Sequence, residues 1–345
     1  MSHLKLKFAV AGVLLLMLVP ALSACGSSTT TPAAKKIKVG LVTDTGGLND
    51  KSFNHLADVG LENAKSQLGI QGDVVESHSE SDYVPNLTNF ASKGYDLVIG
   101  VGFLMQTAIG TVSTNFPKVK FAIIDGAGTD AKGNDLKNPN VESLFFKEQD
   151  AGALVGAVAG ALEKANLTPK KSHVISAVGG ISIPPVDHYI AGYKWAALQQ
   201  DPTLKVLVGY GNDFSDPTKC GSVATAQIGQ GADVLFQVAG GCGLGVIKAA
   251  DTASVYSIGV DADQKDAGTS VILSALKKVD VATFDAIKGV KDGTFQGGAL
   301  IFSLANDGVG YAVDNLTLPA DVKASVDDLA AKIKSGALTP PATIP

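Results

Sequence analysis

Residues 38–54 read K-V-G-L-V-T-D-T-G-G-L-N-D-K-S-F-N, and this stretch decides the fold class. Its apolar start predicts a buried strand, the segment from Asp44 to Lys51 a loop, and the residues from Ser52 onward a helix. In open α/β folds, strand ends and helix N-termini converge on a crevice where ligands bind. The polar side chains after the strand are therefore candidates for ligand contact. The simpler alternative is that Asp50 or Ser52 only caps the helix.

The rest of the chain alternates short β-branched runs with segments of helical period. Strands are expected at 73–78, 97–101, 120–125, 141–146, 172–178, 205–210, 234–239, 256–261, 270–275 and 298–304. Helices are expected at 52–68, 149–163, 186–200, 219–229 and 281–290. The run Leu97–Val101 is apolar at every position, as strands covered on both faces must be. A doubly wound, mostly parallel α/β protein is predicted.

About ten strands are too many for one compact sheet with helices on both sides. We expect two lobes, the first formed by 37–130 plus about 266–296 and the second by 131–265 plus about 297–345. The polar segment Gly126–Asn140 is the expected first crossing. Repeated crossing produces a hinge and a cleft that closes around a ligand.

The charge of the chain limits its partners. The 345 residues carry a net charge of −5, which gives no support for nucleic-acid binding. All 28 basic residues are lysine. Because arginine is the usual clamp for carboxylates and phosphates, its absence favours a neutral, hydroxyl-rich ligand.

The N-terminus has the pattern of an export signal. Lysines precede the apolar run Phe8–Val19, which is short for a membrane span but suits a signal-peptide core. The following L-S-A-C, at 22–25, resembles a bacterial lipobox. It implies a signal peptide at 1–24, a lipid on Cys25 and a flexible tether at 25–36. The folded part would be held on the extracytoplasmic face of the cell membrane, and an uncleaved anchor is the alternative.

Cys220 and Cys242 are the other two cysteines. In an oxidising compartment two cysteines suggest a disulfide, and each lies near a predicted strand end, so a disulfide between them is a candidate. The sequence does not show whether their Cα atoms come close enough.

Other motifs do not support a cofactor, a metal or catalysis. Gly240–Gly245 reads G-G-C-G-L-G, which is not the G-x-G-x-x-G of dinucleotide-binding enzymes. The acidic run Asp261–Asp266 has an aspartate where a calcium loop needs glycine. We find no nucleophile elbow and no close pair of carboxylates. The chain is therefore not expected to be an enzyme, and no cofactor or metal is expected.

Motifs in a fixed order resemble those of the basic membrane lipoprotein (BMP) family, from Ile37 to about Asn306. They are V-T-D-T-G-G-L-N-D-K-S-F-N (42–54), V-G-F-L-M (101–105), F-A-I-I-D-G (121–126), P-P-V-D-H-Y-I-A-G-Y (184–193), D-V-L-F-Q-V-A-G-G-C-G-L-G (233–245), I-G-V-D-A-D-Q (258–264) and L-S-A-L-K-K-V-D (273–280). Members are lipoproteins of bacterial ABC importers that bind purine nucleosides. The resemblance implies a type I periplasmic-binding fold that clamps the nucleoside between its lobes.

The resemblance also implies residues for binding the base. Asp44 would hydrogen-bond the purine edge, with Asn49 or Asn54 assisting. Phe53 and Tyr189 would sandwich the ring, since a purine offers a π-face to aromatic side chains. Tyr189 departs from the phenylalanine expected in this family, and a Phe or Tyr in a first helical turn often only packs in the core.

A second group would bind the sugar. Asp125, Asp261 and Lys277 would hold the ribose hydroxyls, because vicinal hydroxyls donate to carboxylates and accept from an ammonium group. Adjacent Lys278 is the alternative to Lys277. Gly241 would let the backbone approach the ligand. Its neighbour Cys242 replaces the threonine or serine more usual in the family.

The expected function is delivery of a purine nucleoside to ABC permease subunits by a monomeric, lipid-anchored receptor. A free sugar is the alternative ligand, because the same fold serves sugar receptors. A ligand-sensing lipoprotein is the alternative role. Nucleoside hydrolysis or phosphorolysis would be revealed by accumulation of free base.

Overall fold

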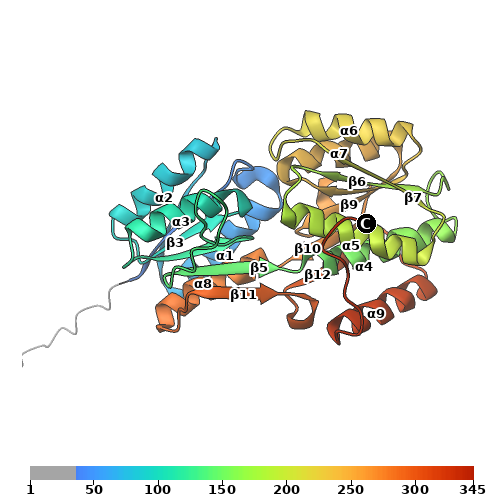
Figure 1. The fold of residues 1–345 in the computed structure, drawn as a ribbon. Helices are drawn as coiled ribbons and strands as arrows, with labels where there is room; N and C mark the ends of the chain where they lie inside the picture. The colour runs from blue at the N-terminus through green and yellow to red at the C-terminus, as the bar shows by residue number, and fades with distance from the viewer. Residues whose placement is uncertain (1–35) are drawn as a thin grey trace, which may run out of the picture. The chain divides into compact units, whose positions relative to one another are not determined.

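The computed structural model describes residues 36–345, which form one compact unit. Two six-stranded sheets organise it (Figure 1). The first sheet has the order β11 (Gly298–Phe302), β5 (Val141–Phe146), β4 (Lys120–Ile124), β3 (Leu97–Val101), β1 (Lys38–Val42) and β2 (Gln71–Val75). The second has the order β12 (Val309–Val313), β10 (Val271–Lys277), β9 (Tyr256–Asp261), β8 (Val234–Val238), β6 (Val174–Gly179) and β7 (Lys205–Tyr210). Neighbouring strands are parallel except β12, which runs antiparallel to β10.

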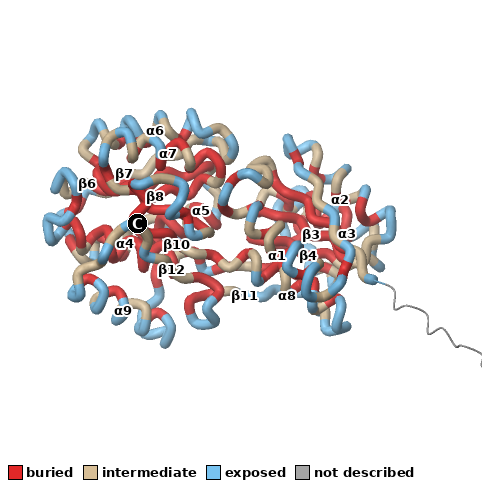
Figure 2. The backbone as a smooth tube through the Cα atoms, turned by 180° about the vertical axis from the view of Figure 1, so that it is seen from behind, coloured by how far each residue is buried: buried red, intermediate tan, exposed pale blue. Residues whose placement is uncertain are grey.

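Helices cover both faces of each sheet, as the apolar strands require. On the first sheet, α2 (Tyr83–Ser92) and α3 (Gln106–Asn115) cover one face, and α1 (Phe53–Leu68) and α8 (Val279–Asp292) the other. On the second, α6 (Pro217–Gly229) and α7 (Gly243–Ala253) lie opposite α4 (Glu148–Lys164) and α5 (Pro184–Gln200), and α9 (Ala320–Lys334) packs on α4. Figure 2 shows buried strands and exposed outer helix faces. The predicted type I periplasmic-binding architecture is confirmed.

Helices α4 and α5 pack closely because glycines replace larger side chains at their contact. A Cβ at Gly152 would lie 2.1 Å from the carbonyl oxygen of Tyr189, and one at Gly156 would lie 2.2 Å from that of Tyr193. Only hydrogen at these positions lets the backbones approach. This contact places Tyr189 of α5 and Glu148 of α4 at the same end of the second sheet.

The lobe boundaries differ from those expected from the sequence. β5 lies in 131–265, which was expected in the second lobe, but it pairs with β4 in the first sheet. β10 lies in 266–296, which was expected in the first lobe, but it pairs with β9 in the second sheet. β11 returns to the first sheet and pairs with β5. The first crossing therefore follows Phe146 instead of lying in Gly126–Asn140. Strand pairing, which composition does not reveal, determines these boundaries.

Two buried acidic residues lie near the C-terminal end of α4. Glu163 and Asp233 are both 0% exposed. One oxygen of Glu163 accepts hydrogen bonds from the hydroxyl of Thr168 and the backbone N–H of His173, and one oxygen of Asp233 accepts from the backbone N–H of Lys170. Burial, and then hydrogen bonding to Asp233, raise the pKa of Glu163 to about 8. Glu163 therefore keeps a proton at neutral pH.

Replacing Glu163 with glutamine should remove part of the pH dependence of stability. In the folded protein Glu163 keeps its proton up to about pH 8, whereas an ordinary glutamate releases it near 4.5. The free energy of unfolding should therefore fall as pH rises through this interval, by up to about 1.4 kcal/mol per pH unit. Urea unfolding at pH 5 and pH 8 should show a smaller difference for Glu163→Gln than for the parent. Equal differences would contradict a raised pKa of Glu163 in the folded protein.

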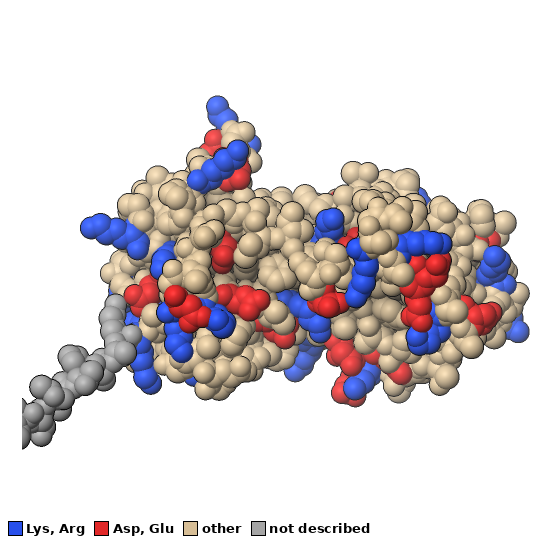
Figure 3. Space-filling model, turned by 90° about the horizontal axis from the view of Figure 1, so that it is seen from below, with Lys and Arg blue, Asp and Glu red and all other residues tan. Residues whose placement is uncertain are grey.

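The predicted signal peptide 1–24, Cys25 as the predicted lipidation site, and nearly all of the predicted tether 25–36 lie outside the described residues. Among the helices of residues 36–345, none is both long and apolar enough to cross a bilayer. On the face drawn in Figure 3, lysine and acidic side chains are interspersed over both lobes.

Candidate ligand-binding site

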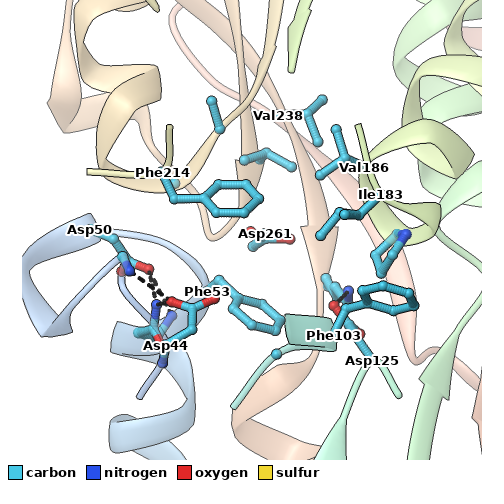
Figure 4. A pocket seen from close by; sticks show the side chains of 18 of the residues that line it. Asp44, Asp50, Phe53, Phe103, Asp125, Ile183, Val186, Phe214, Val238 and Asp261 are labelled. Carbon is cyan, nitrogen blue, oxygen red and sulfur yellow. Dashed lines mark hydrogen bonds and ion pairs between the residues drawn. The ribbon is translucent and has the colours of Figure 1, made fainter. Parts of the chain in front are cut away.

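A cavity lies where the carboxyl ends of the two sheets meet. Its position is the one at which open α/β sheets bind ligands. Figure 4 shows acidic and aromatic side chains directed into it from both lobes. The lining residues are Asp44, Gly46, Asp50, Phe53, Asn54, Gly102, Phe103, Leu104, Asp125, Ile183, Pro185, Val186, Tyr189, Phe214, Val238, Ala239, Gly240, Val260, Asp261 and Lys277.

The loop after β1 supplies a rigid carboxylate–amide pair. Asn54 Nδ2 donates to Asp44 Oδ1 over 2.8 Å, and the backbone N–H of Asp44 donates to Asn54 Oδ1 over 3.2 Å. Asp50 accepts from the backbone N–H groups of Ser52, Asn54 and His55, so it caps α1. Capping is thus the role of Asp50, whereas Asp44 keeps its Oδ2 for a ligand.

Lys277 lies between two carboxylates at the end of β10. Its Nζ donates to Asp125 Oδ2 over 2.6 Å and to Glu148 Oε1 over 2.9 Å, and its side chain is 2% exposed. Asp125 follows β4 of the first sheet and Glu148 opens α4, so the ammonium group bridges the lobes. His188 Nδ1 lies 3.0 Å from the other oxygen of Glu148. The Lys277 Nζ also lies 4.8 Å from the ring centre of Phe146.

One oxygen of this cluster lacks a partner. Asp125 Oδ1 is buried without a hydrogen-bond partner among residues 36–345. Lys277 uses two of its three N–H donors on Asp125 and Glu148. An unpaired acceptor beside a remaining cationic donor is therefore available to a ligand hydroxyl.

Asp261 links three parts of the site. Its Oδ2 accepts from the hydroxyl of Ser52 over 2.7 Å, which joins the lobes, and its Oδ1 accepts from the hydroxyl of Tyr189 over 3.0 Å. Asp261 has φ of 62° and Asp125 has φ of 67°. Aspartate tolerates this left-handed region better than most residues, but positive φ remains uncommon in residues other than glycine. Both strand-end aspartates thus have strained backbones at the site.

The charge balance makes the site rich in acceptors. Burial raises the pKa of Asp44 to about 6 and raises the pKa of Asp261, and it raises that of Asp125 against the attraction of Lys277. Although burial opposes the charge of Lys277, Asp125 and Glu148 raise its pKa. A single lysine therefore faces several carboxyl groups, an arrangement that suits a neutral ligand with donors.

Aromatic rings divide the cavity. Figure 4 shows Phe53 between Asp44 on one side and Asp125 on the other, with Phe214 across the cavity from Phe53. Tyr189 lines the cavity but is 2% exposed, and its ring meets Phe236 edge-on with centroids 6.0 Å apart.

Comparison with known proteins identifies the family. A family model described as ABC transporter substrate-binding protein PnrA-like (Bmp) matches residues 37–340. The chain belongs to this family. Members of the Bmp family are solute-binding proteins of ABC transporters and not enzymes.

Relatives agree with this assignment. The ABC transporter nucleoside-binding protein BmpA of Lactococcus lactis is 31% identical over 92% of this chain and 92% of that protein. An uncharacterized lipoprotein of Pyrococcus abyssi is 34% identical over 90% of this chain and 77% of its own. The crystal structure of an ABC transporter solute-binding protein from Aeropyrum pernix has a TM-score of 0.80 and 29% identity, covering 88% of this chain and 94% of that one.

Seven of the nine ligand-binding residues expected from the sequence lie on the cavity wall, namely Asp44, Phe53, Asn54, Asp125, Tyr189, Asp261 and Lys277. Asn49 is exposed and does not line the cavity, because the 3-10 turn Leu48–Asp50 directs the next residue, Asp50, inward. Gly241 is buried but off the wall, whereas Gly240 lines it. Of the two adjacent lysines, Lys277 is the buried one.

The structure adds residues that sequence reasoning missed. Phe214 follows β7 within N-D-F-S-D, an aromatic residue in a polar loop at a strand end, and that position was a usable signal. Glu148 opens α4, where an acid is ordinarily explained by the helix dipole. The disulfide that the sequence suggested between Cys220 and Cys242 is confirmed, with Cα atoms 5.5 Å apart. Among the described residues, no cluster of His, Cys, Asp and Glu is placed to hold a metal.

Proposed function

We propose that this substrate-binding protein captures a purine nucleoside between its lobes and delivers it to the permease subunits of an ABC importer. The observation that carries the proposal is the arrangement of polar groups at the two ends of an aromatic slot. At one end lie Lys277 and Asp125, whose Oδ1 has no partner, and at the other end lies the hydrogen-bonded pair of Asp44 and Asn54. A ligand that fills such a cavity has polar groups at both ends and a flat apolar centre.

The sugar of the nucleoside binds at the Lys277 end. One ribose hydroxyl donates to Asp125 Oδ1 and another to Asp261, while Lys277 donates its remaining N–H to a ribose oxygen. A phosphate in this position would meet several buried carboxyl groups, so nucleotides are disfavoured.

The base binds at the Asp44 end. Its ring lies between Phe53 and Phe214, which face one another across the cavity, and Phe214 thereby takes the role expected for Tyr189. Tyr189 instead orients Asp261 through its hydroxyl. Asp44 Oδ2 accepts from the ring edge of the purine. A free sugar would leave Asp44 Oδ2 without a ligand group to accept from, and this favours a nucleoside over a sugar.

The proposal includes the location of the receptor. The lipobox-like L-S-A-C at 22–25 provides a lipid on Cys25, and a relative at 34% identity is named a lipoprotein. The folded unit then works as a monomer on the extracytoplasmic face of the cell membrane, after removal of residues 1–24.

Calorimetric titration tests the ligand class. The purified protein, unfolded and refolded to remove carried ligand, is titrated with guanosine, inosine, adenosine, cytidine and ribose. We expect one-to-one binding of purine nucleosides, about tenfold or more tighter than cytidine, and no heat with ribose. Binding of ribose without nucleosides would leave the fold assignment intact and overturn the ligand class.

A further inference from the structure

The disulfide between Cys220 and Cys242 lies behind the cavity wall that carries Phe214. Cys220 belongs to the first turns of α6, and Cys242 ends the 3-10 turn Gly240–Cys242 that precedes α7. Both side chains are 0% exposed. The bridge therefore joins the segments that follow β7 and β8, the two strands on either side of β6, at the edge of the second sheet where the ligand site is formed.

The bridged turn holds Phe214 through its backbone. The N–H of Cys242 donates to the carbonyl oxygen of Phe214 over 2.9 Å. A Cβ at Gly240 or Gly241 would lie 3.3 Å from that same oxygen, so the turn and Phe214 are in direct contact. The ring of Phe214 lies over Gly180, where a Cβ would come within 2.4 Å of it.

The side-chain hydrogen bonds of Asp213 in this loop are local. Asp213 Oδ1 accepts from the backbone N–H groups of Ser215 and Asp216, and Asp213 Oδ2 accepts from Lys219 Nζ. These bonds shape the loop internally but do not attach it to the turn Gly240–Cys242. The Cys242–Phe214 hydrogen bond attaches the loop to that turn, and the disulfide attaches α6, which follows the loop, to the same turn.

The same turn also meets the first lobe. A Cβ at Gly241 would lie 3.7 Å from Cα of Asp50, the residue that caps α1. The bridged turn thus lies against the backbone of Phe214 in the second lobe and against Asp50, three residues before Phe53, in the first.

We propose that the Cys220–Cys242 disulfide is a positioning device of the ligand site, which holds Phe214 in the orientation that faces Phe53. Disulfides stabilise folds by restraining the unfolded chain, and that effect would not depend on Phe214. Here the bridge also reduces the ordering cost of ligand binding by fixing a side chain that the ligand contacts. The identity of that ligand rests on the proposed function, whereas the positioning does not.

Hydrogen exchange of the ligand-free protein tests the positioning directly. In the variant Cys220→Ala/Cys242→Ala, amides of 211–216 and 240–242 should exchange faster, while those of β1 and β3 should be unchanged. Unchanged exchange in both segments would overturn the proposal, whatever the ligand.

Guanosine titration tests the consequence for binding. Removing the disulfide should weaken guanosine affinity about three- to tenfold in the parent, and leave it nearly unchanged in a Phe214→Ala background. An equal loss in both backgrounds would show that the disulfide does not act through Phe214, and would overturn the proposal. If the parent does not bind guanosine, the proposed function fails, and the exchange experiment still decides the positioning.

A second variant keeps the disulfide. A Cβ at Gly211 would lie 2.5 Å from Cys220 Sγ, so Gly211→Ala must displace the bridge or the loop. It should accelerate exchange at 240–242 and weaken guanosine binding, again through Phe214. Gly229→Ala, at a position of α6 with open space around it, is the matched control and should change neither. Unaltered exchange and affinity in Gly211→Ala would contradict the proposal even if the double-cysteine variant does not fold.

Discussion

Replacing Lys277 with methionine is expected to lower the free energy of unfolding by about 3–5 kcal/mol, because it leaves two buried carboxylates without their cation. Asp125 and Glu148 lie 2.6 and 2.9 Å from Lys277 Nζ and have little access to water. The same change removes a ligand donor, so guanosine affinity should fall by about a hundredfold or more. Urea unfolding at pH 7 and calorimetry measure the two effects.

Lys278→Met is the matched control. Lys278 is adjacent in sequence but partly exposed, so its replacement should change stability by less than about 0.5 kcal/mol and leave affinity unaltered. A loss below about 1 kcal/mol for Lys277→Met would mean that Lys277 is not the counter-charge of the buried acids.

Replacing Asp125 with asparagine should weaken guanosine binding by about ten- to a hundredfold, with a smaller loss of stability than Lys277→Met causes. Asparagine tolerates the positive φ of this position, so the backbone is preserved. Lys277 keeps Glu148 as a partner, which limits the structural damage. Calorimetry with guanosine and with 2′,3′-dideoxyguanosine measures how much of the loss involves ribose hydroxyls.

The affinity loss should disappear with the dideoxynucleoside, since Asp125 then has no 2′- or 3′-hydroxyl to accept from. An equal loss with both ligands would mean that Asp125 does not bind the sugar. Asp307→Asn provides the control, because Asp307 also has positive φ but lies on the surface, paired with Lys334. Its replacement should leave both affinities unchanged.

The strands were predictable because covering both faces of a parallel sheet requires continuous apolar runs. All ten expected strand positions overlap observed strands, but β12, near the C-terminus, was not expected. Val309–Val313 reads V-G-Y-A-V, in which a glycine interrupts the apolar pattern. The partner of each strand was not predictable, since β5, β10 and β11 resemble strands of either lobe.

The site was predictable where chemistry and position coincide. Asp125 and Asp261 each end an apolar strand, which marks the ligand edge of a sheet. Asn49 was misplaced because a one-residue shift in a short turn exchanges the exposed and buried positions. Phe214 was missed because it approaches Phe53 only through tertiary packing of the two lobes.

The return of β11 to the first sheet has a consequence for how the protein folds. A chain synthesised from its N-terminus presents β5 as an open edge until residue 302 has emerged, since β11 is the neighbour of β5. Until then, Phe146 lacks Phe302, whose ring stacks on it with centroids 4.9 Å apart. The first lobe is completed only after most of the second has been synthesised. A fragment ending at residue 147 would therefore expose β5 as an unpaired, aggregation-prone edge strand rather than form an independent lobe.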